Sequence, residues 1–366
     1  MIGINNLFLI KTYYRRKFSF LIIATAIIIV LSFASCSAES GVSEFFGGPS
    51  DDGPGDGGAT LPGGGWTVVL DSKFGSSSIR AIAWGGGKFV AGGDNGKMAY
   101  STDAKNWTAV ADSKFGTNYT NFISGIAWGN NIFIAVGDHG DMAYSTDAET
   151  WTAVADSKCG SSTINAIAYG NGTFVAGGIA GKVVTSPDGE TWTAHGESIF
   201  SPTTINSIAW GNDMFIAVGT NGINGQMAYS SDGETWTAVT NNTFGNSAIT
   251  GITWGADLFV AVGNDGKMAT SPDGETWTAV TDSKFGSYMI KNIAWGNDMF
   301  VAVGSDSAGY PYNPNKTTTS SDGINWTVVI DNKFATGSIN AIAWGGGKFV
   351  VAGRDGDLYG KMVYWD

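Results

Sequence analysis

Cysteine and histidine are scarce in this chain of 366 residues, which contains two of each. Cys159 stands where related segments have Phe, so we interpret it as a small buried apolar residue rather than half of a disulfide. His139 and His195 occupy unrelated positions, which leaves too few soft ligands for a zinc or haem site. The sequence predicts no disulfide framework, no metal centre and no cofactor, with calcium in acidic turns such as Asn264-Asp265 as an open alternative.

Basic residues are also in the minority, since Lys and Arg total 20 against 32 Asp and Glu, for a net charge of -12. Residues 1–35 hold four of the positive charges and no acid, so the net charge of the chain without them is -12 minus 4, or -16. A surface this acidic repels phosphate groups. We therefore predict no electrostatic attraction to nucleic acid or to anionic membrane surfaces.

The N-terminus has the pattern of an export signal. A basic cluster, Lys11–Lys17, precedes an apolar run, Phe18–Val30, that is shorter than the roughly 20 residues of a membrane-spanning helix. Small residues then lead to Cys36, and the whole resembles a bacterial lipoprotein signal in which this cysteine becomes the lipidated N-terminus. The resemblance implies loss of residues 1–35 and export to the bacterial cell envelope. Phe33, where Leu is usual, leaves open an uncleaved signal anchor or ordinary cleavage with an incidental cysteine.

Residues 37–65 consist largely of Gly, Ser, Asp and Pro, with Phe45 and Phe46 as the only aromatic residues. Such a segment cannot bury enough apolar surface to fold, so residues 36–65 are predicted to be a flexible tether behind the lipidated cysteine. Ser37, rather than Asp, resembles the pattern of lipoproteins that are sent on to the outer membrane or cell surface. The folded body is then predicted to span residues 66–366.

One motif, Ser-x-Asp-(Gly or Ala)-x-x-Trp, recurs six times at a spacing of about forty residues. Asp-Gly between two β-prone runs favours a hairpin, because Asp accepts backbone N–H bonds within the turn and Gly adopts positive φ. The Trp begins the returning strand and is large enough to fill a core position. The copies are Ser101–Trp107, Ser145–Trp151, Ser186–Trp192, Ser230–Trp236, Ser271–Trp277 and Ser320–Trp326.

Each repeat contains four short β-prone runs, as in an antiparallel meander. In the first repeat these runs are Ile79–Trp84, Lys88–Gly92, Lys97–Ser101 and Trp107–Val110. The first and fourth types each occur seven times, but the chain opens with a fourth-type run, Trp66–Leu70, and closes with a third-type run, Lys361–Trp365. The N-terminal strand is therefore predicted to complete the last sheet and close the ring. We expect an all-β fold, a seven-bladed β-propeller of four-stranded antiparallel blades.

The repeated motifs resemble Asp-box repeats, also called bacterial neuraminidase repeats, and the resemblance covers residues 66–366. The usual box has one more residue between Asp and Gly, and Ala104 and Ala148 replace the Gly in two copies. In that family the box is a structural turn remote from any active site, and the fourteen tryptophans here likewise fall on repeat positions, which favours a core role. The residues implied as structural are Ser101, Asp103, Trp107, Asp147, Trp151, Asp188, Trp192, Asp232, Trp236, Asp273, Trp277, Asp322 and Trp326.

Asp-box repeats occur in sialidases, other glycosidases, sortilin-like receptors and assembly factors, so the resemblance implies a fold and not one function. A sialidase is excluded, because that family clamps its substrate with three arginines and only Arg80 and Arg354 follow residue 35. Another glycosidase would need two facing carboxylates, whereas acids such as Asp94 and Asp355 are explained by hydrogen bonding within turns. A glycosidase that uses carboxylates of channel-mouth loops stays an alternative.

The second residue of the first-type run varies between repeats and is usually polar. First strands line a propeller's channel, so this set is predicted to ring one mouth, together with the long loop 305–316 and an extension in the last repeat. The mouth is either simply solvated or a site for a small polar or anionic ligand or a partner. The candidate ligand-binding residues are Arg80, Asn165, Asn206, Lys291, Asn340, Tyr310, Tyr312, Arg354 and Tyr359.

These patterns favour a lipid-anchored, exported and monomeric binding or scaffold module over an enzyme. The expected partner is an envelope protein or a glycan, and nucleic acid is not expected.

Overall fold

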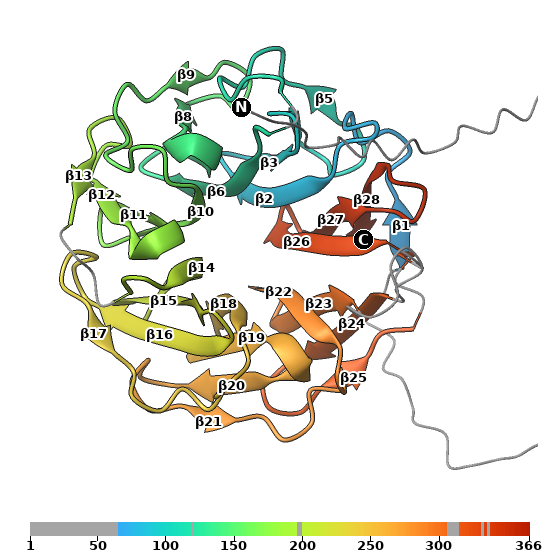
Figure 1. Ribbon diagram of the computed structural model, residues 1–366. Helices are drawn as coiled ribbons and strands as arrows, with labels where there is room; N and C mark the ends of the chain where they lie inside the picture. The colour runs from blue at the N-terminus through green and yellow to red at the C-terminus, as the bar shows by residue number, and fades with distance from the viewer. Residues whose placement is uncertain (1–64, 119, 196–199, 306–314, 331–332, 335–336) are drawn as a thin grey trace, which may run out of the picture. The chain divides into compact units, whose positions relative to one another are not determined.

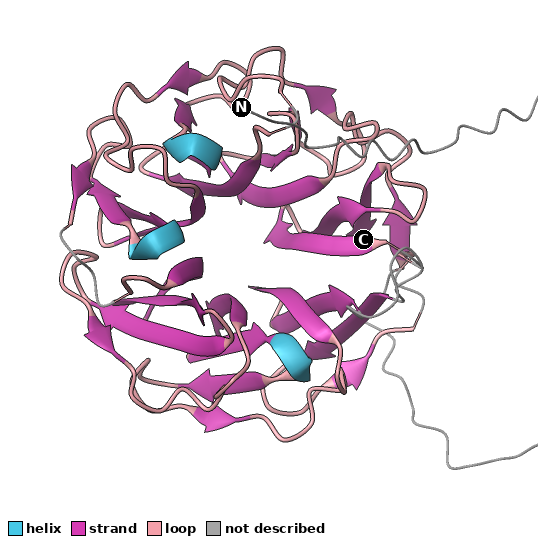
Figure 2. Ribbon diagram, viewed as in Figure 1, coloured by secondary structure: helices cyan, strands magenta, loops and turns pink. Residues whose placement is uncertain are grey.

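The strands form from short runs rich in Val, Ile, Phe and Thr that alternate with turns of Gly, Asn and Asp. The computed structural model describes residues 65–366, apart from residues 119, 196–199, 306–314, 331–332 and 335–336. Its strands form seven four-stranded antiparallel sheets arranged in a ring (Figures 1 and 2), which confirms the predicted seven-bladed propeller. The predicted signal, Cys36 and the tether up to residue 64 lie outside the described residues, as do Tyr310 and Tyr312.

Each blade presents four strands in order from the channel to the rim, and we number the blades one to seven in the order of their innermost strands. These innermost strands are β2 (Ile79–Gly85), β6 (Ile123–Gly129), β10 (Ile164–Gly170), β14 (Thr204–Gly211), β18 (Ile249–Gly255), β22 (Met289–Gly296) and β26 (Ser338–Gly345). The second strands are β3 (Lys88–Gly93), β7 (Ile132–Gly137), β11 (Thr173–Gly178), β15 (Met214–Asn221), β19 (Leu258–Gly263), β23 (Met299–Ser305) and β27 (Lys348–Arg354).

The outer half of each blade is shorter. The third strands are β4 (Met98–Ser101), β8 (Met142–Ser145), β12 (Val183–Ser186), β16 (Asn224–Ser230), β20 (Met268–Ser271), β24 (Asn315–Ser320) and β28 (Gly360–Trp365). The rim strands are β5 (Thr108–Ala109), β9 (Thr152–Ala153), β13 (Thr193–Ala194), β17 (Thr237–Ala238), β21 (Thr278–Ala279), β25 (Thr327–Val328) and β1 (Trp66–Val68). The helical elements are the 3-10 turns η1 (Asp138–Gly140), η2 (Ile179–Gly181) and η3 (Asn264–Gly266). Within the described part of the chain, no helix is long and apolar enough to cross a membrane.

The ring closes as predicted, because β1 at the N-terminus pairs antiparallel with β28 at the C-terminus, with Trp66 opposite Trp365. β2 of the first blade also contacts β26 of the seventh, so the innermost strands form an unbroken circle. Trp66 packs in one apolar cluster with Val329 of blade six and Trp365 of blade seven. The last blade is thus built from both ends of the described chain, which leaves no missing rim strand.

Apolar side chains from facing blades form the core, in clusters that each span two neighbouring blades. The tryptophans at the start of the rim strands, or one residue before it, are buried, whereas those one residue before the end of the innermost strands are partly buried. The latter lie flat on a glycine of the preceding blade, so a Cβ on Gly85 would stand 2.0 Å from the ring of Trp128. Cys159 is buried where its sister repeats place Phe74 and Phe285, as predicted, and burial raises the pKa of its thiol to about 11.

Candidate functional site

A β-bulge interrupts every innermost strand near its start, at the second or third residue of the strand. In blade one, Ile79 pairs with Gly93 and Ala81 with Gly92, which leaves Arg80 as the extra, unpaired residue. The same register shift occurs in the other six blades, at the positions that the sequence singled out as variable. A bulge bends its strand and redirects one side chain, so these seven residues project from the sheet instead of alternating with it. The seven are Arg80, Ser124, Asn165, Asn206, Thr250, Lys291 and Asn340.

Five of the seven bulge residues link their blade to the next one around the ring. Each donates a side-chain hydrogen bond to the backbone carbonyl that immediately precedes the neighbouring blade's bulge. The Asn206 amide, for example, lies 2.8 Å from the carbonyl oxygen of Ile249, and the Asn340 amide lies 2.8 Å from that of Ile79. The equivalent donors in the remaining three are Ser124, Asn165 and Thr250. Asn165, Asn206 and Asn340 therefore have a structural role within the ring, in addition to any contact with a ligand.

Arg80 makes a different set of contacts. Its Nε donates to a carboxylate oxygen of Asp94, in the connection that follows β3, and its guanidinium lies 4.4 Å from the centre of the Phe122 ring in blade two. The side chain of Arg80 is nevertheless 43% exposed. A guanidinium held by a carboxylate and an aromatic ring keeps a defined direction while presenting further N–H donors to solvent.

Lys291, the seventh bulge residue, is half-buried, and burial lowers the pKa of its ammonium group. In its blade the neighbouring residue supplies the link to blade seven, since the Asn292 amide lies 3.4 Å from the carbonyl oxygen of Asn340. Lys291 lines neither the channel nor the depression described next. Arg80 thus lines both cavities without Lys291, which the sequence grouped with it.

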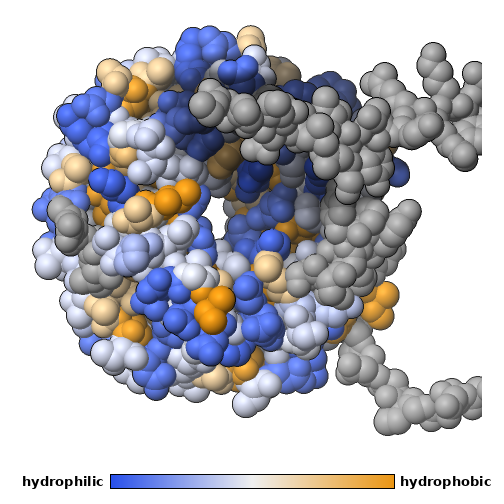
Figure 3. All heavy atoms as spheres, viewed as in Figure 1, coloured by the Kyte–Doolittle hydropathy of each residue, from blue (hydrophilic) through white to orange (hydrophobic). Residues whose placement is uncertain are grey.

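A depression of about 490 Å³ opens at the mouth of the channel, and blades seven, one, two and three contribute residues to its lining. Arg80 and Arg354 both line it, so the two arginines of the described chain meet at one site despite a separation of 274 positions in the sequence. Asn165 and Asn340 line it as well, whereas Asn206 lines the channel of about 190 Å³ beneath. Figure 3 views this face and shows the channel opening among hydrophilic and apolar residues.

Arg354 ends β27, and its Nε donates to the carbonyl oxygen of Leu358, 3.0 Å away in the extension that the sequence analysis noted. Tyr359 in the same extension faces a second groove of about 400 Å³, together with Asp355 and Val68. The candidate set thus divides between the mouth, the channel and this outer groove. Ser78, Asp94 and Phe122 at the mouth were not predicted, because only the fold brings them beside Arg80.

Carboxylates are few at the mouth. Among the described residues that line the channel and the depression, Asp94 is the one acid, and it is paired with Arg80. Burial, and then the charge of Asp138, raise the pKa of Asp141 in blade two, but neither acid lines these cavities. A pair of facing acids, which glycoside hydrolysis requires, is not offered by the described lining. Within the described residues, no cluster of His, Cys, Asp and Glu could hold a metal ion.

The six repeated turns lie at the opposite end of the blades and satisfy their own polar groups. In the first, the Ser101 hydroxyl donates to Asp103, which also accepts the backbone N–H groups of Lys105 and Asn106 at 2.8 Å. The Trp107 indole donates to the carbonyl of Ala104, which adopts a φ of +63° although it is not glycine. The same bonds recur in the other five turns, and Asp103 lies in none of the cavities described above. These contacts give the turn a structural role.

Comparison with known proteins gives the class of the fold. Residues 186–344 match the family described as the DUF6242 beta propeller domain, which is less than half of the chain. A comparison with curated proteins finds no match. The chain is thus similar in sequence to one propeller family over its second half, and this agrees with the architecture observed.

Solved structures extend the likeness to the whole ring. The chain is similar to YCF48 bound to a D1 peptide, with 16% identity, a TM-score of 0.64, and coverage of 84% of this chain and 96% of that one. YCF48 from Cyanidioschyzon merolae is similar at 17% identity, with a TM-score of 0.63 and coverage of 82% and 98%. The WD40 beta propeller domain of Doa1 follows at 12% identity and a TM-score of 0.57, over 82% and 97%. At these identities the likeness shows the fold alone.

Proposed function

We propose that this protein is an exported, lipid-anchored binding module of the bacterial cell envelope, and that its channel mouth binds an anionic group of a partner. In this proposal residues 1–35 are a signal peptide, Cys36 carries the lipid, residues 37–65 are a tether, and the six turns are Asp boxes. The observation that carries the binding role is the meeting of Arg80 and Arg354 in one depression of a chain that is otherwise poor in arginine. Guanidinium groups present paired donors that suit carboxylate or phosphate oxygens.

A protein partner is favoured over a free small molecule. The depression is open and polar, and exposed Leu358 lies in the Arg354 extension beside it, so the surface combines charge with apolar contact. A propeller of the same fold is known in complex with a peptide, which gives a precedent for peptide binding by this architecture. Chemistry at the mouth is not part of the proposal, because the described lining supplies one carboxylate that is already paired.

The binding role is tested by affinity capture from the native cell envelope with the full-length chain as bait, with protein and glycan readouts. We expect the double variant R80A/R354A to lose the partner that the wild type retains, and direct titration to show affinity lower by about 100-fold. The matched control is K158A, which removes an exposed cation paired with Asp156 outside the depression. Equal capture by wild type and double variant would contradict the proposal.

The anchor is tested separately. Metabolic labelling with a radioactive fatty acid should mark the wild-type chain and leave C36S unmarked, and the marked chain should fractionate with envelope membranes. Labelling of both chains, or of neither, would exclude the lipid at Cys36 and leave the binding role of the mouth standing.

A further inference from the structure

The rim strands of blades six and seven carry large apolar residues where the other blades carry small or polar ones. Two positions after the rim tryptophan stand Val68 and Val328, and every other blade has Ala there. Four positions after it stand Leu70 and Ile330, against small or polar residues elsewhere. The residues at that fourth position in blades one to five are Ala111, Ala155, Gly196, Thr240 and Thr281. Because the five other blades fold without these side chains, the propeller itself does not require them.

These apolar side chains face solvent. Leu70 is 99% exposed and Ile330 is 76% exposed. On the same two blades, Val68, two residues before Leu70, and Ile324, in the turn that precedes β25, are 40% and 57% exposed. Ile179 and Ile223 are exposed singly on blades three and four, as is ordinary on a surface, whereas these four residues share the rim of two adjacent blades, which marks a contact area. We call Val68, Leu70, Ile324 and Ile330 the apolar strip.

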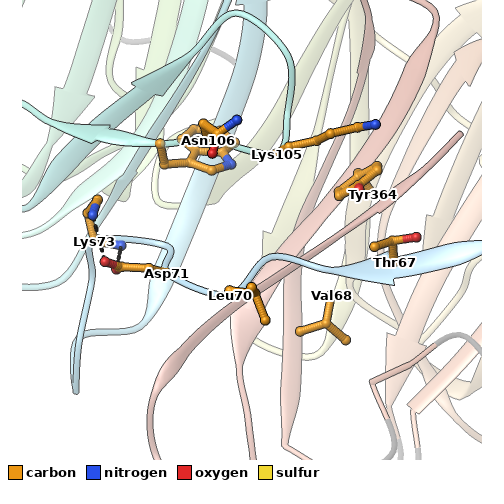
Figure 4. A pocket seen from close by; sticks show the side chains of 9 residues that line it. Thr67, Val68, Leu70, Asp71, Lys73, Lys105, Asn106 and Tyr364 are labelled. Atoms are coloured by element: carbon orange, nitrogen blue, oxygen red, sulfur yellow. Dashed lines mark hydrogen bonds and ion pairs between the residues drawn. The ribbon is translucent and has the colours of Figure 1, made fainter.

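The two halves of the strip are neighbours on the rim. Trp66 of blade seven and Val329 of blade six pack in the same cluster, and Figure 1 shows β1 and β25 at successive positions around the ring. A groove of about 560 Å³ adjoins the strip between β1 and the first repeated turn (Figure 4). Val68 and Leu70 extend to the same side of the chain there, and Tyr364 and Lys105 form the far wall. The strip therefore borders a groove through Val68 and Leu70.

Charge is distributed unevenly around the rim. In blades two to five the residue after the turn's Gly or Ala is a glutamate, whereas blade one has Lys105 and blade six has Ile324. The glutamates are Glu149, Glu190, Glu234 and Glu275. Beside the strip, Asp71 is paired with Lys73 at 2.6 Å, and Asp366 is paired with Lys348 and lies 3.5 Å from Lys105. Blades one and six thus lack the glutamate that the turns of blades two to five carry, and Asp71 and Asp366 near the strip are each paired with a lysine.

The chain enters the propeller at this part of the rim, because the residue that follows the proposed tether is Trp66, the first residue of β1. A Gly- and Ser-rich coil the length of residues 37–65 would have a root-mean-square span of roughly 30 Å, so a lipid on Cys36 would tie the body to a membrane through this part of the rim. We infer that the apolar strip docks on the lipid surface to which the anchor is attached and stands the propeller on this edge. The inference rests on the proposed anchor at Cys36.

Docking on this edge has a consequence for the partner site. The strip lies on the rim, whereas Arg80 and Arg354 lie at the channel mouth, so contact of the rim with lipid leaves the mouth open to the aqueous phase. Insertion of apolar side chains at the headgroup boundary, rather than attraction to anionic lipid, would supply the contact energy.

Depth-dependent quenching tests the orientation on the full-length, lipidated chain in vesicles of phosphatidylethanolamine and phosphatidylglycerol. Lipidation consumes Cys36 and Cys159 is buried, so a cysteine introduced on the surface is the reactive thiol for an environment-sensitive fluorophore. The strip is probed by L70C and I330C, and the matched controls are A155C and T281C, which occupy the equivalent exposed position in blades two and five. Brominated lipids should quench the two strip sites at least about two-fold more than the two controls.

Each outcome has one meaning. Chains that fail to float with vesicles would show that the anchor is absent, which overturns this inference together with the proposed anchor. Chains that float but are quenched equally at all four sites would overturn the docked edge and leave the anchor intact. Protection of the strip from water without quenching, at a level that rises with protein density, would identify a second copy of the chain as the occupant and overturn contact with lipid. Stronger quenching at both strip sites than at the controls supports docking of the strip on lipid. The quenching at L70C should then be lost when Ile330 is also changed to Ser.

Discussion

The two ends of each blade are made by one repeated sequence, yet they use their polar groups differently. At the turn end, Asp103 accepts hydrogen bonds from Ser101 and from backbone groups no more than three residues away. At the bulge end, Asn206 donates to a carbonyl 43 residues away, in another blade. Local bonds form whatever the neighbouring blade contains, and bonds between blades depend on their assembly.

This difference explains where the repeats vary. A turn that satisfies itself works in every blade with the same residues, so all six copies keep Ser, Asp and Trp. A bulge needs only a donor of suitable length, so Ser, Thr and Asn interchange, and two blades replace the donor by Arg80 and Lys291. Variation among the repeats therefore marks the positions at which a ligand site can arise without loss of the fold.

The largest expected effect comes from the turn end. W192A removes a buried indole that closes its turn through a bond to the carbonyl of Gly189, 3.1 Å away, and should lower the free energy of unfolding by about 3–5 kcal/mol. The measurement is guanidinium unfolding followed by circular dichroism. W192F, which keeps most of the apolar volume, should lower the free energy of unfolding by less. A decrease below about 1 kcal/mol for W192A would contradict a stabilising role of the indole in the turn.

Acid should weaken the turn end before the bulge end. Burial opposes ionisation of Asp103, but hydrogen bonds from Asn106, Lys105 and Ser101 outweigh it and lower its pKa from 3.8 to about 2. A carboxyl with a lower pKa in the folded state stabilises the fold above pH 3.8, and this contribution disappears as the pH falls toward 2.

The same sign holds for the turn acids Asp147, Asp188 and Asp273, whose pKa values are lowered. Stability measured between pH 5 and pH 2 should therefore decline, and D103N should decline less steeply than the wild type. Parallel curves for the two proteins would contradict this account. N206A is a control, because the side-chain amide that it removes does not titrate.

At the bulge end a single link should matter less. N206A removes the donor to the carbonyl of Ile249 and should cost about 1 kcal/mol, the net contribution of a typical neutral hydrogen bond. N206T should restore most of the loss, because Thr250 makes the same link one blade further on, at 2.5 Å. Equal destabilisation by N206A and N206T, measured from the midpoints of unfolding, would mean that the amide acts by packing rather than by its bond.

The smallest expected effect is an increase in the free energy of unfolding. Burial lowers the pKa of Lys291, so its charge opposes folding below that pKa, and K291N would remove the charge and supply the amide found in blades three, four and seven. We expect an increase of about 0.5–1 kcal/mol at neutral pH that shrinks as the pH rises toward 10.5, where the unfolded lysine also loses its proton. R80N is the contrasting control, since it breaks the pair with Asp94 and should bring no gain.

Many residues of the candidate site could be predicted from the sequence, but which of them share one cavity could not. The variable position was visible in aligned repeats because a fixed period exposes any residue that departs from it. The bulge was not visible, since a register shift depends on the partner strand: Arg80 is unpaired only because Ala81 is opposite Gly92. Tyr359 was grouped with the mouth on its place in the chain, but the extension after β27 directs it to the outer groove. Tyr310 and Tyr312 stay predictions.

What the sequence alone determined was the ring: seven repeats of a four-strand pattern, offset so that Trp66 had to return to the strand ending at Trp365. Turn chemistry and strand propensity act over a few residues, so they can be read along the chain. Which side chains share a site was decided only by the closed ring, because closure places Arg80, Asp94 and Arg354 around one depression. Contacts between residues hundreds of positions apart depend on how blades pack, and no local pattern encodes that geometry.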